Sequence, residues 1–516
     1  MTESGSNNDS RQSAVLLSKE LRSYCQSESL SEEGLREMIE RHPNNNHVGD
    51  YEFFLEACYN ERVTVGIIQY LLEYFPVAIS DADEDGHLPL HLACQNPNVT
   101  PEIIQLLVDA APDSLRSVTN NGHVPLHYFC DSKDEDDRKA MQILKLLIER
   151  QSDAVRHVDN DGFLPIHHAC AERSPEFCRL LVEAYPGSEG MSDSNGMLPL
   201  HFACMTNTVA TVEYLYKLYP DAIKHTTTDG YYPVHFAMKG AERRDNPIAA
   251  VGDVKYLLDC DPSVKFQKVN GLSLLEFACQ GEFNDKIIEA ALKVIETIYD
   301  AHPEAIESNR IASNIQWYHQ RIQAFLNGEL VYARQARDHR LMTTPDGNGQ
   351  LPLHTALQNN VKLGSIKLLV KGNPPAVQST DNSGALPLHV ACQHHESADV
   401  IQYLVGLDIT TLDAVDRDGN TALHFACHCA RHEFIALLLG KYNGVSVSKR
   451  NAHGKLPIDL LWESNVVLDR DSVEYTESVF RLLKAYPEMV MTTDMQTDSV
   501  ARLSQNRKKR KFDHEE

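Results

Sequence analysis

The chain has 516 residues, of which 42% are hydrophobic and 23% charged, so most of it can bury apolar surface and fold. Forty-eight Lys and Arg oppose 73 Asp and Glu, which leaves a formal net charge of -25 at pH 7. A field of this sign repels phosphate backbones and attracts basic groups. Direct binding of nucleic acid by the folded body is therefore not expected.

The N-terminal residues, MTESGSNNDSRQS, lack the charged-then-apolar pattern of a signal peptide. No stretch approaches the roughly 18 consecutive apolar residues that a membrane-spanning helix requires. We therefore expect an intracellular protein, cytoplasmic, nuclear or both, that does not contact a membrane.

One seven-residue phrase recurs along the chain. It reads LPLHLAC at 88–94, VPLHYFC at 124–130, LPIHHAC at 164–170, LPLHFAC at 198–204 and YPVHFAM at 232–238, and it returns as LPLHTAL at 351–357, LPLHVAC at 386–392, TALHFAC at 421–427 and LPIDLLW at 456–462. Weaker copies end at Cys58 and Cys279, which makes eleven in all. The first series has steps of 36, 40, 34 and 34 residues, and the second has steps of 35. A period of this size indicates stacked supersecondary units.

Most phrases follow a small turn residue and a glycine, as in Asp85-Gly86 and Asn348-Gly349. The glycine can adopt the positive φ of a tight turn, and the proline of the phrase suits the first turn of a helix. A second helix should follow, and Thr100-Pro101-Glu102 and Ser174-Pro175-Glu176 supply start signals for it. Prolines just beyond this helix are expected to end it: Pro76, Pro112, Pro186, Pro220, Pro262, Pro303 and Pro487.

A turn and two helices, repeated with a Pro-Leu-His core, resemble the ankyrin repeat over residues 45 to 490. Leu in place of Thr, Cys in place of Ala and a longer connection ending in Pro suggest a divergent subfamily with longer units. The resemblance implies that the histidine of the phrase is structural and ties neighbouring units together through hydrogen bonds to turn backbone. It assigns this role to His91, His127, His167, His201, His235, His354, His389 and His424. The bond is in doubt at Glu276 and Asp459, where the phrase has decayed.

The fold class predicted is an all-α solenoid of about ten to eleven helix-turn-helix units, with a helical insertion between two blocks. We expect a disordered N-terminus over 1–14, a first repeat block with N-terminal capping helices over 15–305, a second block over 344–490 and a disordered tail over 491–516. Residues 306–343 are either a helical insertion or a degenerate repeat. One helical face there is predicted from Ile315, Tyr318, Ile322, Phe325 and Leu326.

Nothing in the sequence indicates catalysis, a metal site or a cofactor. The chain lacks phosphate-binding glycine loops and the common hydrolase and metalloprotease motifs. The densest candidate for metal is Cys427-His428-Cys429 with His424 and His432, but its spacing is wrong for a structural zinc site. Eight of the twelve cysteines occupy one slot of the repeat, where a small apolar side chain fills the space between helices, so we expect them to be reduced core residues.

The resemblance favours a non-enzymatic scaffold or adaptor that binds a protein or an extended peptide, for which the acidic charge suits a basic segment. The alternatives are a nuclear regulator acting through bound transcription or chromatin proteins and a substrate-recruiting subunit of a modification enzyme. Oligomeric state stays open.

Solenoids bind along their turns and inner helices, so the residues after the turn glycines are the candidate partner-binding positions. In the first block these residues are aromatic or, in one case, a flexible apolar methionine: His87, His123, Phe163, Met197 and Tyr231. Alternatively these side chains pack on one another along the array, and burial distinguishes the two readings. The acidic run DSKDEDD at 131–137 is either a solvated loop or a docking patch for a basic segment.

A basic run in the C-terminal tail contrasts with the acidic body and is a candidate nuclear localisation signal; the alternative is a solvated tail. It consists of Arg507, Lys508, Lys509, Arg510 and Lys511. Fused to a cytoplasmic reporter, residues 500–516 should move it into the nucleus, as measured by fluorescence microscopy. A reporter that stays diffuse would reject the signal.

Overall fold

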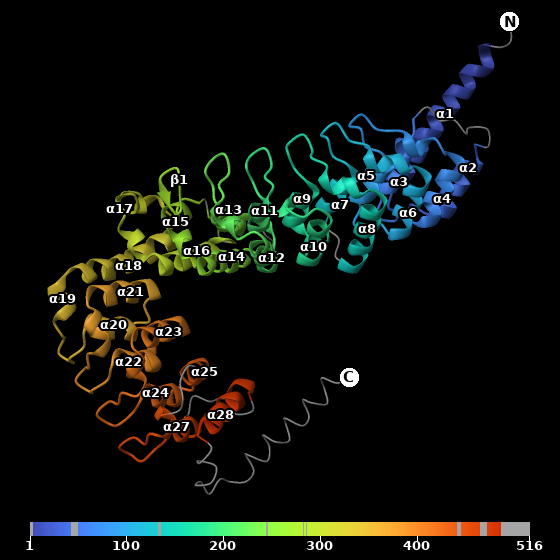
Figure 1. The fold of residues 1–516 in the computed structure, drawn as a ribbon. Helices are drawn as coiled ribbons and strands as arrows, with labels where there is room; N and C mark the ends of the chain where they lie inside the picture. The colour runs from blue at the N-terminus through green and yellow to red at the C-terminus, as the bar shows by residue number, and fades with distance from the viewer. Residues whose placement is uncertain are drawn as a thin grey trace, which may run out of the picture. The chain divides into compact units, whose positions relative to one another are not determined.

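The computed structural model describes residues 4–42, 50–132, 136–243, 246–281, 283–284, 286–440, 445–464 and 472–486. In these ranges it consists of paired α-helices, short 3-10 helices and one two-stranded hairpin (Figure 1). The all-α repeat solenoid predicted from the period is confirmed. No helix in this part of the chain is both long and apolar enough to cross a bilayer.

The array divides into two compact units, an N-terminal block up to Ile298 and a C-terminal block from Tyr299. The boundary falls within helix α16 (Ile288–Ala301).

In the N-terminal block, each repeat contributes one helix to an inner row and one to an outer row (Figure 1). The inner helices are α1 (Ser4–Cys25), α3 (Glu52–Tyr59), α5 (Pro89–Gln95), α7 (Pro125–Asp131), α9 (Pro165–Glu172), α11 (Pro199–Thr206), α13 (Pro233–Arg243) and α15 (Leu274–Ala278). The outer helices are α2 (Glu32–Glu40), α4 (Val65–Tyr74), α6 (Pro101–Ala110), α8 (Asp137–Arg150), α10 (Pro175–Ala184), α12 (Val209–Leu218), α14 (Ala249–Cys260) and α16. The pair α1 and α2 covers α3 and α4, so it caps the end of the array.

The C-terminal block repeats this arrangement. Its inner helices are α20 (Pro352–Gln358), α22 (Pro387–His394), α24 (Ala422–His428) and α27 (Pro457–Glu463). Its outer helices are α18 (Gln320–Arg337), α21 (Leu363–Gly372), α23 (Ala398–Leu407), α25 (His432–Gly440) and α28 (Val473–Ala485), and α26 (Val445–Ser448) is a short connection.

The prolines after the outer helices do more than end them, because most begin a 3-10 helix. The 3-10 helices that begin at a proline are η2 (Pro112–Arg116), η5 (Pro220–Lys224), η6 (Pro262–Phe266), η7 (Pro303–Glu307) and η9 (Pro374–Gln378). Those that begin at another residue are η1 (Ala78–Ser80), η3 (Ser152–Arg156), η4 (Ser188–Gly190) and η10 (Ile409–Leu412). The predicted N-caps are confirmed, since Thr100 and Ser174 accept the backbone N–H of Ile103 and Phe177. A short hairpin loop then leads to the next inner helix. In one repeat this loop forms β1 (Lys268–Val269) and β2 (Leu272–Ser273), paired antiparallel.

Backbone hydrogen bonds join successive hairpin loops. In the N-terminal block the bonds are Asn120 N to Asp85 O, 2.9 Å; Asn160 N to Asn121 O, 3.1 Å; Ser194 N to Asp161 O, 3.1 Å; and Thr228 N to Asn195 O, 2.9 Å. In the C-terminal block they are Asn382 N to Asn348 O, Arg417 N to Ser383 O and Ala452 N to Asp418 O. Since each loop donates to the one before it, the loops are held in register along each block.

Polar side chains after the inner helices make a second set of contacts between repeats. The Asn96 amide donates to the carbonyls of Cys58 and Asn60 in the preceding repeat, at 2.9 and 2.8 Å. The buried Arg173 guanidinium donates to Phe129 O, 2.6 Å, and lies over the rings of Phe129 and Phe177. These contacts tie the end of one inner helix to the repeat that follows it.

Residues 306–343 form three helical pieces and not one long helix. They are α17 (Asn309–Asn314) with η8 (Ile315–Trp317), α18, and α19 (His339–Thr343). Of the predicted face, Ile322 and Leu326 are buried in α18, whereas Ile315 and Tyr318 precede it because the chain turns at Tyr318 and His319. Helix α18 packs on α21 as an outer helix does, which favours a degenerate repeat over an insertion.

The hydroxyls and carboxylate of Tyr299, Ser365 and Glu329 join the elements around α18. Tyr299 Oη lies 3.0 Å from Ser365 Oγ, and Ser365 Oγ donates to Glu329 Oε2 at 2.5 Å.

The N-terminus departs from expectation, because α1 begins at Ser4, within the stretch 1–14 for which disorder was predicted. Pro487, the tail over 491–516 and its basic run lie outside the described residues, as do residues 133–135 of the acidic run.

Substitution of Gly162 by alanine tests whether successive hairpin loops must approach closely. Its φ is +85°, and an added Cβ would lie 2.6 Å from Ser194 N of the next loop. Gly187 has a φ of +94° with nothing within 4 Å of such a Cβ, so it is the matched control. Both Ala variants should lose roughly 1–2 kcal/mol to backbone strain. Gly162→Ala should lose more because the loops must separate; equal urea midpoints for the two variants would contradict this.

Candidate functional site

The residues after the turn glycines do not stand at the apex of the hairpin loops. Asp83 N donates to His87 O at 3.1 Å, so the apex is formed by residues 84–86 and His87 closes the loop. The turn itself is as predicted, because the glycines before the phrases have φ between 75° and 85°: Gly86, Gly122, Gly162, Gly196, Gly230, Gly349, Gly384 and Gly419. All five candidate partner-binding residues, His87, His123, Phe163, Met197 and Tyr231, are half-buried.

Four of these five side chains contact the residue that follows the repeat histidine in the next repeat. His87 Nε2 is 2.8 Å from Tyr128 Oη, and His123 meets the ring of His168 edge-on with centroids 5.6 Å apart. Phe163 packs on Phe202 with ring centroids 5.5 Å apart. Tyr231 packs on Phe277 at 6.0 Å, and the Lys239 ammonium lies over the Tyr231 ring. The side chains therefore pack along the array and still leave part of each ring exposed.

The sequence interpretation overlooked the other half of this row. The position after the repeat histidine is occupied by Tyr128, His168, Phe202, Phe236 and Phe277. Its signal was present in the phrase itself, since the slot is aromatic in five successive repeats. We call the two sets together the aromatic row.

The repeat histidines are buried and each makes a local cap. The Nδ1 of His91 accepts the backbone N–H of Leu88 at 3.0 Å, and all eight predicted histidines make the equivalent bond within their own repeats. Glu276 and Asp459 make the same cap with a carboxylate oxygen, at 2.7 and 2.8 Å. In the eight histidines, the cap fixes Nδ1 as the hydrogen-bond acceptor, so the proton of the neutral ring is on Nε2.

Five of the eight histidines use that proton to bond a carbonyl of the next repeat. The bonds run from His91 to Ser117, from His127 to Phe163, from His167 to Met191, from His389 to Ala414 and from His424 to Lys455, at 3.0 to 3.2 Å. The Nε2 atoms of His201, His235 and His354 are buried without a hydrogen-bond partner. The inter-repeat bond that the resemblance implies is thus made in part of the array.

Burial keeps these imidazoles neutral. It lowers the pKa of His91 and His235 to about 4 and that of His127 and His201 to about 3. It also lowers the pKa of the other repeat histidines, His167, His354, His389 and His424.

An acidic hollow of about 320 Å³ lies beside the start of the aromatic row. Its lining includes Glu52 and Glu56 of α3 and Asp83, Glu84 and Asp85 of the first hairpin loop, with one base, Arg22. Arg22 pairs with Glu52 and Glu56. Glu84 and Asp85 are exposed, so the hollow presents negative charge to solvent.

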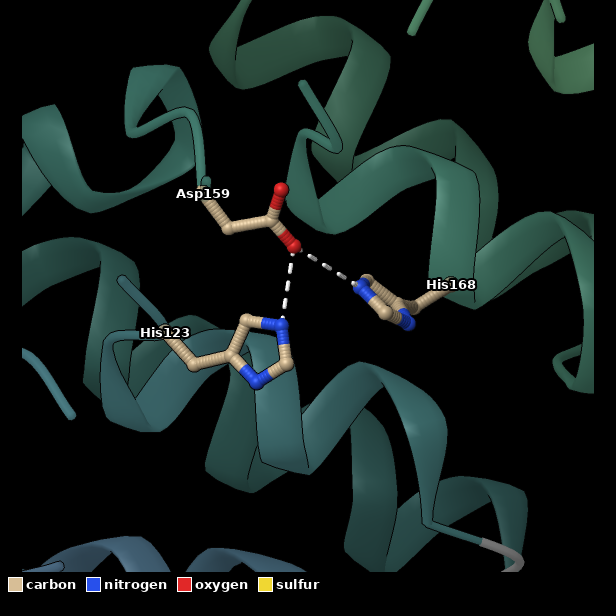
Figure 2. Close-up of side chains that lie close together, drawn as sticks. All are labelled: His123, Asp159 and His168. Atoms are coloured by element: carbon tan, nitrogen blue, oxygen red, sulfur yellow. Dashed lines mark hydrogen bonds and ion pairs between the residues drawn. The ribbon is translucent and has the colours of Figure 1, made fainter. Parts of the chain in front are cut away.

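One His-Asp cluster lies within the aromatic row, where two repeats meet (Figure 2). His123 Nε2 is 2.8 Å from Asp159 Oδ2, and His168 Nε2 is 3.9 Å from the same oxygen. Asp159 Oδ1 accepts the backbone N–H groups of Asp161 and Phe163 at 2.9 and 2.8 Å. One carboxylate oxygen therefore holds the loop and the other faces two imidazoles.

The metal candidate weighed from the sequence has a different arrangement. Cys427 and His424 are fully buried in α24, Cys429 Sγ is 3.6 Å from Gln393 O, and His432 Nδ1 is 3.0 Å from Ser478 Oγ. Within the described ranges, the group of His, Cys, Asp and Glu side chains close enough to share a metal ion is His123, Asp159 and His168. All twelve cysteines are free thiols, and burial raises the pKa of Cys25 and Cys279 to about 12.

Two family models match the chain. The one described as ankyrin repeats (3 copies) matches residues 96–189, 135–229 and 319–413, and the one described as ankyrin repeats (many copies) matches residues 388–439. The chain is an ankyrin repeat protein. None of the curated proteins matches it significantly.

Ankyrin repeats form protein-protein interaction domains, and the ankyrin fold is in general an interaction module without catalytic activity. The aromatic row and the acidic hollow lie on the hairpin loops and inner helices of the ankyrin array. They are therefore the parts of the surface to consider for binding.

The repeat histidines make the stability of this ankyrin protein depend on pH. Their ordinary pKa is about 6.5. Because burial lowers it in the folded state, the unfolded chain binds more protons between about pH 6.5 and pH 4. Their contribution is present above pH 6.5 and is lost as the pH falls through that window, by up to about 1.4 kcal/mol per pH unit for each histidine.

The urea midpoint should therefore be lower at about pH 5.5 than at about pH 7.5. His91→Gln is the matched variant, because an amide oxygen can still cap the helix while the titrating group is gone. Its midpoint should depend less on pH. Identical midpoints at the two pH values in the wild-type protein would contradict the neutral, buried imidazoles.

Proposed function

We propose that this chain is a non-enzymatic scaffold or adaptor that holds an extended, basic segment of a partner protein along the hairpin loops and inner helices of its N-terminal block. The observation that carries the proposal is the acidic hollow beside the aromatic row, on one face of consecutive repeats. Half-buried rings offer rigid apolar contact area, and the adjoining carboxylates offer ion pairs.

The spacing of the repeats suits an extended segment. Packed helices lie about 8–10 Å apart, and an extended chain advances about 3.3 Å per residue. About every third residue of such a segment would then meet an equivalent position of the next repeat. A Lys or Arg would enter the hollow at Glu84 and Asp85, and apolar residues would lie on the rings of Phe163 and Tyr231.

The net charge of -25 supports a basic partner, because it favours encounter with positive segments and disfavours acidic ones. Action as a nuclear regulator, or recruitment of substrates to a modification enzyme, would use the same binding step. The identity of the bound protein separates these roles.

Neutralising the hollow should weaken binding without unfolding the protein. Glu84→Gln with Asp85→Asn removes two exposed charges and leaves Asp83, which holds the turn, unchanged. Zero-length carboxyl-to-amine crosslinking in cells, read by mass spectrometry, should join residues 84 and 85 of the wild-type chain to lysines of a partner. Recovery of that partner by affinity purification without crosslinking should fall about tenfold in the variant, which corresponds to loss of roughly 1.4 kcal/mol of binding free energy.

The matched control is Glu73→Gln with Asp113→Asn, which removes two exposed charges from α4 and η2. It should recover the partner as well as the wild type does. A second variant, Phe163→Leu, removes a ring of the aromatic row while keeping an apolar side chain, and it should also lose the partner. Full recovery with the Glu84 and Asp85 variant, or crosslinks confined to the outer helices, would reject the proposed surface.

A further inference from the structure

We infer that His123, Asp159 and His168 bind a divalent transition-metal ion, and that Zn²⁺ suits their donor atoms best. His123 closes the hairpin loop before α7, Asp159 begins the next hairpin loop, and His168 lies in α9 (Figure 2). The ion would therefore join two successive repeats. It would lie within the aromatic row, so the site adds a function to that surface.

The donor atoms already converge. Their ligand atoms all lie within 4.8 Å of one another, with Asp159 Oδ2 at 2.8 Å from one imidazole nitrogen and 3.9 Å from the other. Four ligands at about 2.0–2.1 Å around tetrahedral zinc are roughly 3.3 Å apart. The two distances to Asp159 Oδ2 would each change by about half an ångström, and the two imidazole nitrogens, which lie within 4.8 Å of each other, would approach by up to about 1.5 Å.

The donor set has the composition of a metal site with an open position. Two imidazole nitrogens and one carboxylate oxygen suit zinc and neighbouring transition metals, whereas calcium and magnesium prefer oxygen ligands throughout. The Asp159 side chain is fully buried, and 22% of the His123 side chain and 19% of the His168 side chain are exposed. A fourth ligand, water or a donor from a partner, could enter from the exposed side.

A simple His-Asp hydrogen bond accounts for only two of the three residues. It satisfies His123 and Asp159 but leaves His168 Nε2 buried without a hydrogen-bond partner. That nitrogen faces Asp159 Oδ2 (Figure 2). A metal ion between them would satisfy it.

The groups around the cluster hold its donors in place. The backbone N–H groups of Asp161 and Phe163 fix the Asp159 carboxylate through Oδ1, so Oδ2 is the oxygen left for a metal. Asp131 Oδ1 lies 3.6 Å from His168 Nδ1, on the other side of the ring from Asp159. A carboxylate behind a histidine ligand favours the proton on Nδ1 and leaves Nε2 free to bind metal.

The repeat fold does not require these residues. The same three positions at neighbouring junctions are His87, Thr119 and Tyr128; Phe163, Asp193 and Phe202; and Met197, Thr227 and Phe236. Each of those junctions keeps its loop and helices without two histidines facing an aspartate. The cluster is thus an addition to the repeat, and phenylalanine is an acceptable residue in both histidine positions.

The test uses the full-length protein, stripped of metal by a chelator in a phosphine reductant that keeps its thiols reduced. Calorimetric titration with Zn²⁺ should show one tight equivalent, and Co²⁺ should give the visible bands of a tetrahedral nitrogen and oxygen site. Both should be absent in His123→Phe and in His168→Phe, and Mg²⁺ should not compete. Zn²⁺ should also raise the thermal midpoint of the wild type and not that of either variant.

His87→Phe is the matched control, because it makes the same change one repeat earlier, and it should bind Zn²⁺ as the wild type does. Asp159→Asn keeps an oxygen acceptor for the loop and removes the metal-facing one, so it should fold and bind at least tenfold more weakly. The inference is overturned if the wild type takes up no tight equivalent. It is equally overturned if the His123, His168 and Asp159 variants bind as much Zn²⁺ as the wild type does.

Discussion

The structure depends on hydrogen bonds that pass from one repeat to the next. The repeat histidine supplies two of them: its Nδ1 caps its own inner helix, and in five repeats its Nε2 reaches a carbonyl of the following repeat. The imidazole must be neutral to do both, and burial keeps it so. The backbone hydrogen bonds between successive hairpin loops also join neighbouring repeats, at the start of the inner helices. The contacts of Asn96 and Arg173 join neighbouring repeats at the other end of these helices.

This way of joining repeats determines where function can lie. The buried face of each repeat is occupied by its neighbours in the array. What it offers is a row of equivalent positions along the loops and inner helices. In the N-terminal block those positions carry rings and carboxylates, and differences between repeats along the row are what can select a partner.

The His-Asp cluster illustrates how a repeat array can gain a local site. Its three residues occupy positions that every repeat possesses, and Asp159 still performs the turn role that Asp83 and Asp193 perform elsewhere. Two histidine substitutions at neighbouring positions are enough to turn a packing contact into a set of converging donors. The cost to the fold is small, because the same positions accept phenylalanine and tyrosine in adjacent repeats.

The sequence by itself determined the repeat period, the turn at each glycine, the start of most inner helices at proline and the burial of the slot cysteines. These are local properties: the positive φ, the fixed φ of proline and the spacing of apolar residues act within a few positions of the chain. These properties recur along the chain, so the same interpretation applies to most repeats. The turn at Tyr318 was not predicted, because a helical face can be drawn through residues that a turn separates.

Only the tertiary structure decided which side chains meet across repeats. His123 and His168 are 45 positions apart in the chain, and the contact depends on how much one repeat is shifted and rotated against the next. Periodicity does not contain that offset, because it arises from the packing of inner helices and from the loop ladder. The same reason applies to the residues that follow the repeat histidine. Each phrase contains such a residue, but only the stacking of successive repeats brings these residues together in one row.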